Sequence, residues 1–520
     1  MRDPAREFEI KLEIPAQTVS KVMRLPWLWE LASGELRPQR LQSVYYDTPR
    51  FALLERGITL RVRRAGATRV QTIKAAANGG ALPIERDEWE EEIAGEGPQL
   101  HLNGTPLEGM AKKKLRKKLK PCFEIHVDRS AFPIQSANSA IEVAIDRAHI
   151  VGEQAASFCE IELELKRGAS SEMARIARRI ASEVPAALSL KTKAERGFAL
   201  LRSQRAQPHF GEPVLLSSAT RVGEAFQSIG WACLRHFALN KDAIEAGDAE
   251  AAHQMRAGLT RLNAAIVIFD RLLDGPETDV VKSEIAWLIG ELDSACALDA
   301  FLEGVASPLR ATQADTAAID ALCEETAQRR QRALQHVIET IASERYRQFV
   351  LRTALWLIAA EWSDKAALHD EEPSRRIGAF ARRALAAGAN EAARRLRKFS
   401  ASAGDGLPEL RTALHRLRCA ADFFAPLFKG RESEARGFVR LLNRLLADTG
   451  RLEDFVTHER LRDDFMRSWT DAESSADPKT AQKACAMGFA LGQQTPEKTA
   501  RANAVVKAGA KLATLKRFWC

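Results

Sequence analysis

The first stretch of the chain with chemically useful spacing is Glu7–Glu13, with the sequence EFEIKLE. Polar and apolar residues alternate strictly, which is the two-residue period of a strand with two different faces. Phe8, Ile10 and Leu12 can pack on a core, whereas the other face carries acids around Lys11. That charged face is either a solvated surface or an inner wall on which carboxylates hold a divalent cation. Only further strands with matching charge can decide between these two interpretations.

Later strand-like segments repeat the alternation, and each one sorts its charges onto one face. Basic faces are predicted at 57–63 and 70–74, and mainly acidic faces at 86–92, 141–146 and 159–165. Charge sorting over about eight strands predicts a barrel with a charged lumen. Like charges that face each other there need a polyvalent ligand. Carboxylates without His or Cys favour Mg²⁺ or Mn²⁺, and the basic side chains favour a polyphosphate.

Length and composition set limits on the possible functions. The 520 residues are enough for two or three domains, and the net charge of +8 suggests a polyanionic partner, without indicating a specific nucleic acid. The eight cysteines form no CxxC pair, so we expect reduced thiols and neither a zinc site nor disulfides. The sequence shows no signal segment and no apolar run of about 18 residues. A cytoplasmic protein without a membrane span is the expectation, and its oligomeric state stays open.

The first part of the chain resembles the CYTH, or triphosphate tunnel metalloenzyme, superfamily. The signature ExExK stands at 7–11. It is followed in order by YYDTP at 45–49, LRVR at 60–63, TIK at 72–74, IEVAID at 141–146, CEIELELK at 159–166 and KAERGF at 193–198. This resemblance spans residues 5–203 and implies a closed eight-stranded antiparallel β tunnel with small helices, which binds a triphosphate.

The resemblance also implies roles for individual residues. The implied catalytic residues are Glu7, Glu9, Lys11, Glu88 and Glu90. The implied metal ligands are Glu7, Glu9, Asp146, Glu160 and Glu162. The implied substrate-binding residues are Lys11, Arg61, Arg63, Lys74, Arg129 and Lys193. Arg129 would point with Ile125 and Val127 in a regular strand, so its role assumes a bulge or a strand end there. Glu13 and Glu164 lie beyond the matched pairs, and we expect them at the rim or surface.

The remainder of the chain is predicted to be helical. From about residue 213 the apolar period changes to 3.6 residues, and the segment 203–213 carries two prolines and a glycine, which is typical of a linker. We therefore predict a tunnel domain at 1–205, a linker at 206–213, a helical domain at 214–500 and a basic C-terminal helix or tail at 501–520.

The helical part contains an internal repeat, because 253–263 aligns with 408–418 and 296–301 aligns with 450–455. This repeat predicts two related helical bundles. This region, residues 215–467, resembles the CHAD domain, a duplicated helical domain that binds inorganic polyphosphate. The polyphosphate-binding residues that the resemblance implies are His253, Arg256, Arg261, Arg411, His415, Arg416 and Arg418. Thr260 and Asn263 stand where arginines are usual, so we expect the first bundle to contribute less.

Together, the two resemblances imply an α+β tunnel followed by all-α bundles. The implied activity is hydrolysis of inorganic triphosphate with Mg²⁺ or Mn²⁺ as cofactor, and the helical domain would gather polyphosphate. A cytoplasmic location associated with polyphosphate granules would follow. Two alternatives remain. The first is another tunnel enzyme, an adenylate cyclase or a thiamine triphosphatase, and the second is a non-catalytic polyphosphate-binding protein.

Overall fold

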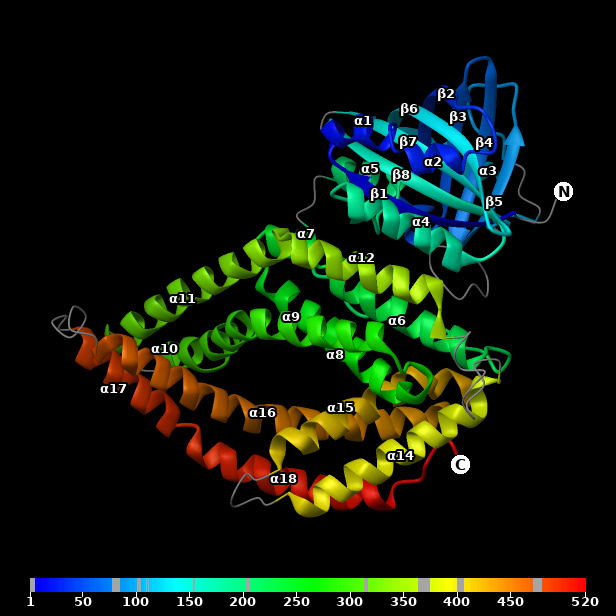
Figure 1. Cartoon of the computed structure of the whole chain (residues 1–520). Helices are drawn as coiled ribbons and strands as arrows, with labels where there is room; N and C mark the ends of the chain where they lie inside the picture. Colours follow the sequence, from blue (N-terminus) through cyan, green and yellow to red (C-terminus); the bar gives the residue numbers. More distant parts are fainter. Residues whose placement is uncertain are drawn as a thin grey trace. The chain divides into compact units, whose positions relative to one another are not determined.

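The computed structural model describes residues 5–76, 85–100, 104–108, 110, 112–152, 155–202, 206–312, 317–362, 375–399, 406–470 and 479–520. The chain divides into two compact units (Figure 1). The first unit is Met1–Arg205 together with Glu344–Asp364, and the second is Ala206–Ser343 together with Lys365–Cys520. Helix α12 (Glu344–Ala359) is thus part of the first unit, although the chain on both sides of it belongs to the second.

The first unit is built on an antiparallel sheet whose described part has nine strands. The strands are β1 (Ala5–Ile14), β2 (Arg37–Asp47), β3 (Thr59–Ala65), β4 (Thr68–Ala76), β5 (Glu85–Glu92), β6 (Lys120–Ser136), β7 (Ser139–Val151), β8 (Ala156–Arg167) and β9 (Ala187–Leu188). Their order is β5-β4-β3-β2-β6-β7-β8-β1-β9, with an additional pairing of β5 with β1. The alternation of the sequence gives each long strand one charged face and one apolar face.

The predicted closed tunnel of eight strands is wrong in two respects, and both concern β1. One edge of β1 pairs with β8 from Glu9 to Ile14. The other edge pairs with β5 over only four residue pairs, Ala5 to Phe8, and then with the short ninth strand β9 at Leu12 and Glu13. The seam between β1 and β5 is therefore partial. β9 satisfies backbone groups on the part of this edge that β5 does not reach.

Short helices complete the first unit: α1 (Val19–Val22), α2 (Pro26–Glu30), α3 (Lys112–Lys118), α4 (Ser170–Glu183) and α5 (Lys193–Arg202). Helix α4 packs on β7 and β8, and its buried residues include Met173, Ile176 and Ile180 at helical spacing. Helix α5 packs on β6. Its position matters for the site, because Lys193 is its first residue.

Aromatic packing fixes α5 against the apolar end of the strands. The rings of Tyr45 and Phe123 are stacked at 4.8 Å between centroids, and Phe198 of α5 meets Phe123 edge-on at 4.9 Å. Ile125 lies in the same buried cluster. Gly197 leaves no room between the helix and Phe123, since a Cβ atom there would lie 2.0 Å from the ring. This close approach requires glycine.

Replacing Gly197 with alanine should therefore destabilise the first unit. The displaced Phe123 ring would cost about 1–3 kcal/mol of unfolding free energy, which exceeds the gain of about 1 kcal/mol in helix propensity. Thermal denaturation measures the difference. Gly97→Ala is the matched control because no atom lies within 4 Å of its added Cβ. Equal Tm values for the two variants would contradict this account of α5 packing.

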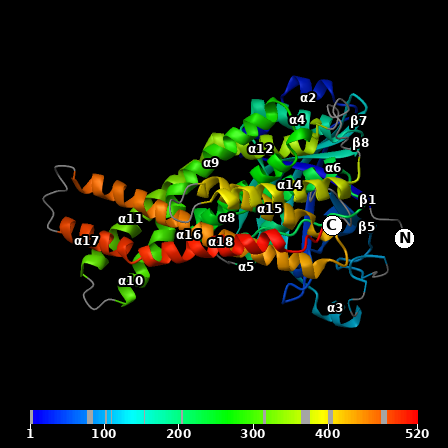
Figure 2. The same cartoon turned by 90° about the horizontal axis from the view of Figure 1, so that it is seen from below.

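The second unit, here called the helical unit, is all α-helical in its described parts. Its main helices are α6 (Val222–Ala238), α7 (Lys241–Glu245), α8 (Ala249–Ile268), α9 (Pro276–Phe301), α10 (Ser307–Thr312), α11 (Ala317–Ala342), α14 (Ile377–Lys398), α15 (Leu407–Phe424), α16 (Glu432–Thr470), α17 (Lys479–Gly492) and α18 (Thr495–Thr514). The repeated segments begin α8 and α15, which pack on each other. Helices α16 and α18 run side by side (Figure 2). No helix in the described ranges combines the length and hydropathy that a membrane span requires.

The segment predicted as a linker, 206–213, is held on the helical unit. The His209 backbone N–H donates to Asn240 Oδ1 at 2.8 Å, and Asn240 Nδ2 donates to the His209 carbonyl at 2.9 Å. The segment 501–520, predicted as a basic helix or tail, forms most of α18 and then ends in two buried aromatic residues. Phe518 and Trp519 pack against Phe438 at 5.7 and 5.0 Å between ring centroids. Both segments therefore form part of the packed helical unit.

Candidate active site

A cavity of about 420 Å³ lies inside the sheet of the first unit. Seven acids line it: Glu7, Glu9, Glu88, Glu90, Glu142, Glu162 and Glu164. Seven basic residues line it as well: Lys11, Arg61, Arg63, Lys74, Arg129, Lys166 and Lys193. The charged face of β1 is thus part of a cavity wall and not an outer, solvated surface.

Strand register places acids opposite bases inside the cavity. Lys11 of β1 is the Cα partner of Glu162 on β8, and Lys74 of β4 is the partner of Glu88 on β5. Because side chains on one face of a strand recur every second residue, the same register also brings further charges to this face, including like charges such as Glu9 opposite Glu164. The alternation in the sequence therefore positions the whole charged lining.

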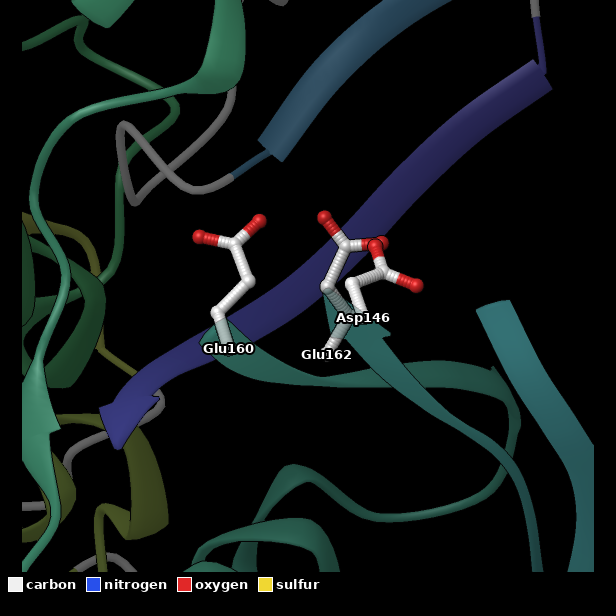
Figure 3. Close-up of side chains that lie close together, drawn as sticks. All are labelled: Asp146, Glu160 and Glu162. Atoms are coloured by element: carbon white, nitrogen blue, oxygen red, sulfur yellow. The ribbon is translucent and has the colours of Figure 1, made fainter. Parts of the chain in front are cut away.

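Three carboxylates from two neighbouring strands form a buried cluster that reaches the cavity through Glu162, which lines it. One oxygen each of Asp146 on β7 and of Glu160 and Glu162 on β8 lie within 4.8 Å of one another (Figure 3). Asp146 and Glu160 are fully buried, and Glu162 is 9% exposed. Three buried carboxylates this close together require compensating positive charge.

Three cations neutralise this acidic cluster. Lys193 Nζ lies 2.8 Å from Asp146 and 2.9 Å from Glu162, and it also bonds Glu160. Arg129 donates two parallel hydrogen bonds to Asp146, at 2.8 and 2.7 Å, and a further one to Glu162. Lys11 bonds Glu162 as well. Lys193, at the start of α5, is thus the one of these cations that contacts all three acids.

Burial and pairing shift the protonation equilibria in opposite directions. Burial alone would raise the pKa of Glu162, but Lys11, Lys193 and Arg129 hold that pKa well below its usual value. Burial alone would lower the pKa of Lys193, but the neighbouring acids raise it well above its usual value. For Glu160 burial dominates, and its pKa is raised in spite of Lys193.

The acidic cluster fits a hard divalent cation. Glu160 Oε2 is buried and accepts no hydrogen bond from any described residue, so it offers a free ligand atom. Oxygen ligands of this kind are those preferred by Mg²⁺ and Mn²⁺. Of the five predicted metal ligands, the structure brings together Asp146, Glu160 and Glu162. Glu7 and Glu9 lie outside the cluster: Glu7 pairs with Lys74, and Glu9 lies 2.8 Å from Lys11.

The remaining predicted phosphate ligands line another part of the same cavity. Lys74 lies 3.2 Å from Glu88, and Arg63 lies 3.2 Å from Glu90. Arg61 lies 3.9 Å from Glu88. Burial alone would lower the pKa of Arg61, but the neighbouring Tyr45, which accepts its hydrogen bond, and Glu88 raise it. All of these basic residues are thus held by acids before any ligand arrives.

The predicted bulge at Arg129 is wrong. Strand β6 pairs with β7 without interruption from Glu124 to Ser136, and its only irregularity against β2 lies at Tyr45 and Tyr46. Arg129 does share a face with Ile125 and Val127, and all three residues line the cavity. The inner face of β6 is apolar at one end because α5 covers it there, and Arg129 begins the charged part.

The structure corrects one of the two expected rim positions. Glu164 lines the cavity, whereas Glu13 pairs with Arg196, and its side chain is 44% exposed. Sequence reasoning missed Glu142, Lys166 and Glu164 as lining residues. The signal was present, because Glu164 and Lys166 continue the alternation of Glu160 and Glu162 along β8.

In the helical unit, the first-copy histidine is already paired. His253 Nε2 lies 3.0 Å from Asp299, which also accepts a hydrogen bond from Arg330 at 2.8 Å. The hydrogen bonds to Asp299 and Cys296 raise the pKa of His253 to about 10. Arg256 pairs with Asp293 at 2.9 Å, and Arg261 lies 3.3 Å from the ring of His236.

The second-copy residues lie on α15, and two of them, Arg411 and Arg418, contact α16. Arg411 pairs with Glu453, and Arg418 pairs with Asp422. Burial, followed by the charges of Arg411, Arg256 and Arg418, lowers the pKa of His415 to about 4. His415 is therefore neutral near pH 7. The sequence assigned the basic surface mainly to the second copy, but Arg256 of the first copy contributes to it through the packing of α8 on α15.

The comparisons with known families match both units. Residues 5–198 match the model of the CYTH domain, and residues 228–463 match that of the CHAD domain. The chain is a CYTH domain followed by a CHAD domain. The matched CHAD stretch includes α12, the helix that packs in the first unit.

Three relatives illustrate the similarity. An inorganic triphosphatase of Haemophilus influenzae is 28% identical over 199 residues, which are 38% of this chain and 55% of that protein, so this chain spans about half of its length. The CHAD domain of the plant Ricinus communis shares the fold, with 24% identity and a TM-score of 0.50 over 60% of this chain and 98% of that chain. A Hippeastrum adenylyl cyclase homologue, described as having a dominant triphosphatase activity, is 15% identical over 38% of this chain and 95% of that chain, with a TM-score of 0.26.

The two histidines should respond differently to pH. The pKa of His253 is raised, so its contribution to stability is complete below about pH 6.5, its unfolded value, and is lost as the pH rises toward about 10. Thermal denaturation of His253→Gln should therefore show a Tm deficit at pH 7.5 that shrinks by pH 9.5. His415→Gln is the control, because His415 is neutral above pH 6.5 in both states. A deficit of His253→Gln that does not change with pH would contradict the pairing.

Proposed function

We propose that the CYTH unit hydrolyses inorganic triphosphate in the cavity. The observation that carries this proposal is the paired lining, in which Lys11, Arg61, Arg63, Lys74, Arg129 and Lys193 are all held by acids around one cavity. A linear triphosphate can replace the acids as the partner of these cations. Its phosphate oxygens would accept charge-assisted hydrogen bonds, which are among the stronger hydrogen bonds in proteins. The similarity to the Haemophilus triphosphatase supports the same reaction.

In this proposal, the acids hold the metal ion and the basic residues bind the phosphate groups. Asp146, Glu160 and Glu162 would hold Mg²⁺ or Mn²⁺, which when bound would neutralise phosphate charge and lower the pKa of a ligated water. Lys193 and Arg129 contact both the acidic cluster and the cavity. They can therefore orient the phosphoryl group next to these acids. Lys11, Arg61, Arg63 and Lys74 would fix the rest of the chain of phosphates, and such positioning supplies much of the catalysis in phosphoryl transfer.

The packing of α5 favours an inorganic substrate over a nucleotide. The apolar part of the inner face, with Ile125 and Tyr45, is already covered by Ala194 and Phe198. A nucleobase would need apolar or aromatic surface of this kind. Some apolar residues, such as Leu41 and Val127, still line the cavity, but most of its lining is charged and suits phosphate groups. Activity toward ATP or thiamine triphosphate is therefore expected to be lower than activity toward tripolyphosphate.

Removing ligand charge without changing shape tests this site. Glu162→Gln should reduce tripolyphosphate turnover at least a hundredfold, because it removes one of the three clustered carboxylates and the partner of three cations. Phosphate release is measured with Mg²⁺ and with Mn²⁺, on tripolyphosphate, ATP and thiamine triphosphate. Glu55→Gln, at an exposed glutamate outside the cavity lining and the acidic cluster, should retain activity.

The outcomes separate the candidate activities. Full turnover by Glu162→Gln would exclude the acidic cluster from catalysis. A preference for thiamine triphosphate, or formation of cyclic AMP from ATP, would favour the other tunnel enzymes. Tripolyphosphate binding by the wild-type protein without any turnover would favour a binding protein.

We propose further that the helical unit binds inorganic polyphosphate on the basic surface formed by Arg256, Arg411, His415, Arg416 and Arg418. Arg256, Arg411 and Arg418 lie close enough to lower the pKa of His415, and Arg416 is exposed on the flank of the same helix. A polyanion on this surface would favour the protonated form of His415. Binding should therefore strengthen as the pH falls from 7 toward 5.

Charge removal on α15 tests this second proposal. Arg411→Gln, Arg416→Gln and Arg418→Gln together should weaken long-chain polyphosphate binding at least tenfold at low salt, and the salt dependence of binding should become shallower. Isothermal titration of the full-length protein at two salt concentrations measures both effects. The triple change Arg460→Gln, Arg462→Gln and Arg467→Gln on α16 removes the same charge from another helix and should bind like wild type. Equal weakening by both triples would mean that net charge alone attracts polyphosphate.

A further inference from the structure

Helix α12 lies inside the CHAD stretch of the sequence but packs in the CYTH unit. It contacts α4 and β9, two elements of that unit. Ser170 Oγ, at the start of α4, donates a hydrogen bond to the Ile358 carbonyl at 2.9 Å. Arg178 pairs with Glu361, just beyond the end of α12, at 3.7 Å. Helix α4 thus packs on the sheet, and α12 packs on α4.

The α4 face that meets α12 includes the small residues Ser170 and Ala174. Ser170 and Arg178 are eight residues apart, so they share a face with Ala174 between them. Ala174 is fully buried. The sheet-facing residues Met173, Ile176 and Ile180 lie on a different side of the helix. A small residue at position 174 lets the two helices approach closely, as is usual where helices pack.

The contact of α12 with β9 connects α12 to strand β1, which carries the cavity residue Lys11. Strand β9 is only Ala187 and Leu188, which pair with Glu13 and Leu12 of β1. The next residue, Ser189, donates its backbone N–H to the Lys11 carbonyl at 2.9 Å. Two residues are too few to form a stable strand without support from packing. Because α12 packs on β9, it supplies such support.

From β9 the chain reaches Lys193 within five residues, through a short segment that hydrogen bonds hold to β1 and α5. Arg196 donates to Ser189 Oγ at 2.9 Å and pairs with Glu13. The Thr192 backbone N–H donates to Glu195 at 2.7 Å, and the Glu195 N–H donates to Thr192 Oγ1 at 3.1 Å, which closes the first turn of α5. The position of Lys193 therefore depends on where β9 is held as well as on the packing of α5 against β6.

We propose that α12 is a positioning element for the triphosphate site, because it holds β9 and thereby the end of α5 that carries Lys193. The proposal rests on the proposed function in that Lys193 is taken to bind the substrate. A helix from within the CHAD stretch then completes the CYTH unit. The first 205 residues without α12 would lack this support, although they contain every cavity residue.

The full-length variant Ala174→Leu tests the proposal, because leucine has no room at a fully buried alanine and should push α12 away from α4. Amide hydrogen exchange at 187–195 should become faster, and the affinity for tripolyphosphate, measured by titration calorimetry, should fall about tenfold. Ser182→Leu, at an exposed position on α4, is the control and should behave like wild type. Unchanged exchange and affinity in a folded Ala174→Leu protein would overturn the proposal.

A double-mutant cycle distinguishes an effect on the position of Lys193 from a general loss of structure. If α12 acts through Lys193, Ala174→Leu should weaken binding in the wild-type background but add little in a Lys193→Ala background, since interacting sites are not additive. Full additivity would overturn the proposal. If Ala174→Leu does not fold, Arg178→Glu replaces it. This change sets two acids opposite each other, and Glu361→Arg should reverse its effect on exchange and affinity.

The same experiments distinguish a failure of the proposed function from a failure of the positioning role of α12. If the wild-type protein binds no triphosphate, the proposed function fails, and the exchange rates at 187–195 still show whether α12 holds β9. If the wild-type protein binds triphosphate and neither variant alters exchange or affinity, the positioning role of α12 fails while the proposed function stands.

Discussion

The pairing of buried acids with buried bases is the interaction on which the CYTH unit depends. Seven acids and seven bases line one cavity, and removing so many charges from water is costly unless each finds a partner. Apolar residues of the same size would stabilise a core at least as well. The paired lining is therefore better explained by ligand binding than by stability. Under the proposed function, a polyphosphate would replace the acids as the partner of the bases, and the acids would become free to take a metal ion.

Local sequence pattern was sufficient to predict most of this lining. A strand has a period of two residues, so Glu7, Glu9 and Lys11 had to share a face, and the same holds for Glu160 and Glu162. The difficulty at Arg129 came from treating the apolar face of β6 as an outer or core face. Ile125 and Val127 are inside the cavity wall because α5 covers them, and no local pattern in β6 can show that a helix some 70 residues later will do so.

Features that depend on distant contacts could not be predicted in this way. The ninth strand has two residues and no periodicity to detect, and its place beside β5 on the edge of β1 depends on where β5 ends. The contribution of Arg256 to the basic surface depends on α8 packing against α15. Likewise, the pairing of His253 with Asp299 joins residues 46 positions apart. The sequence supplied the residue types, and tertiary packing decided which of them meet.

Helix α12 shows that sequence families and folded units need not share boundaries. The change of period near residue 213 correctly marks where strands end and helices begin. It cannot reveal that one later helix packs back on α4, because α12 has the same helical period as its neighbours. Its eleven buried residues include Phe349, Leu351 and Trp356, more than a helix with a single buried stripe would carry. A helix that is buried on most sides is held by several elements. Displacing it would expose a large apolar surface, so its place beside β9 is costly to change.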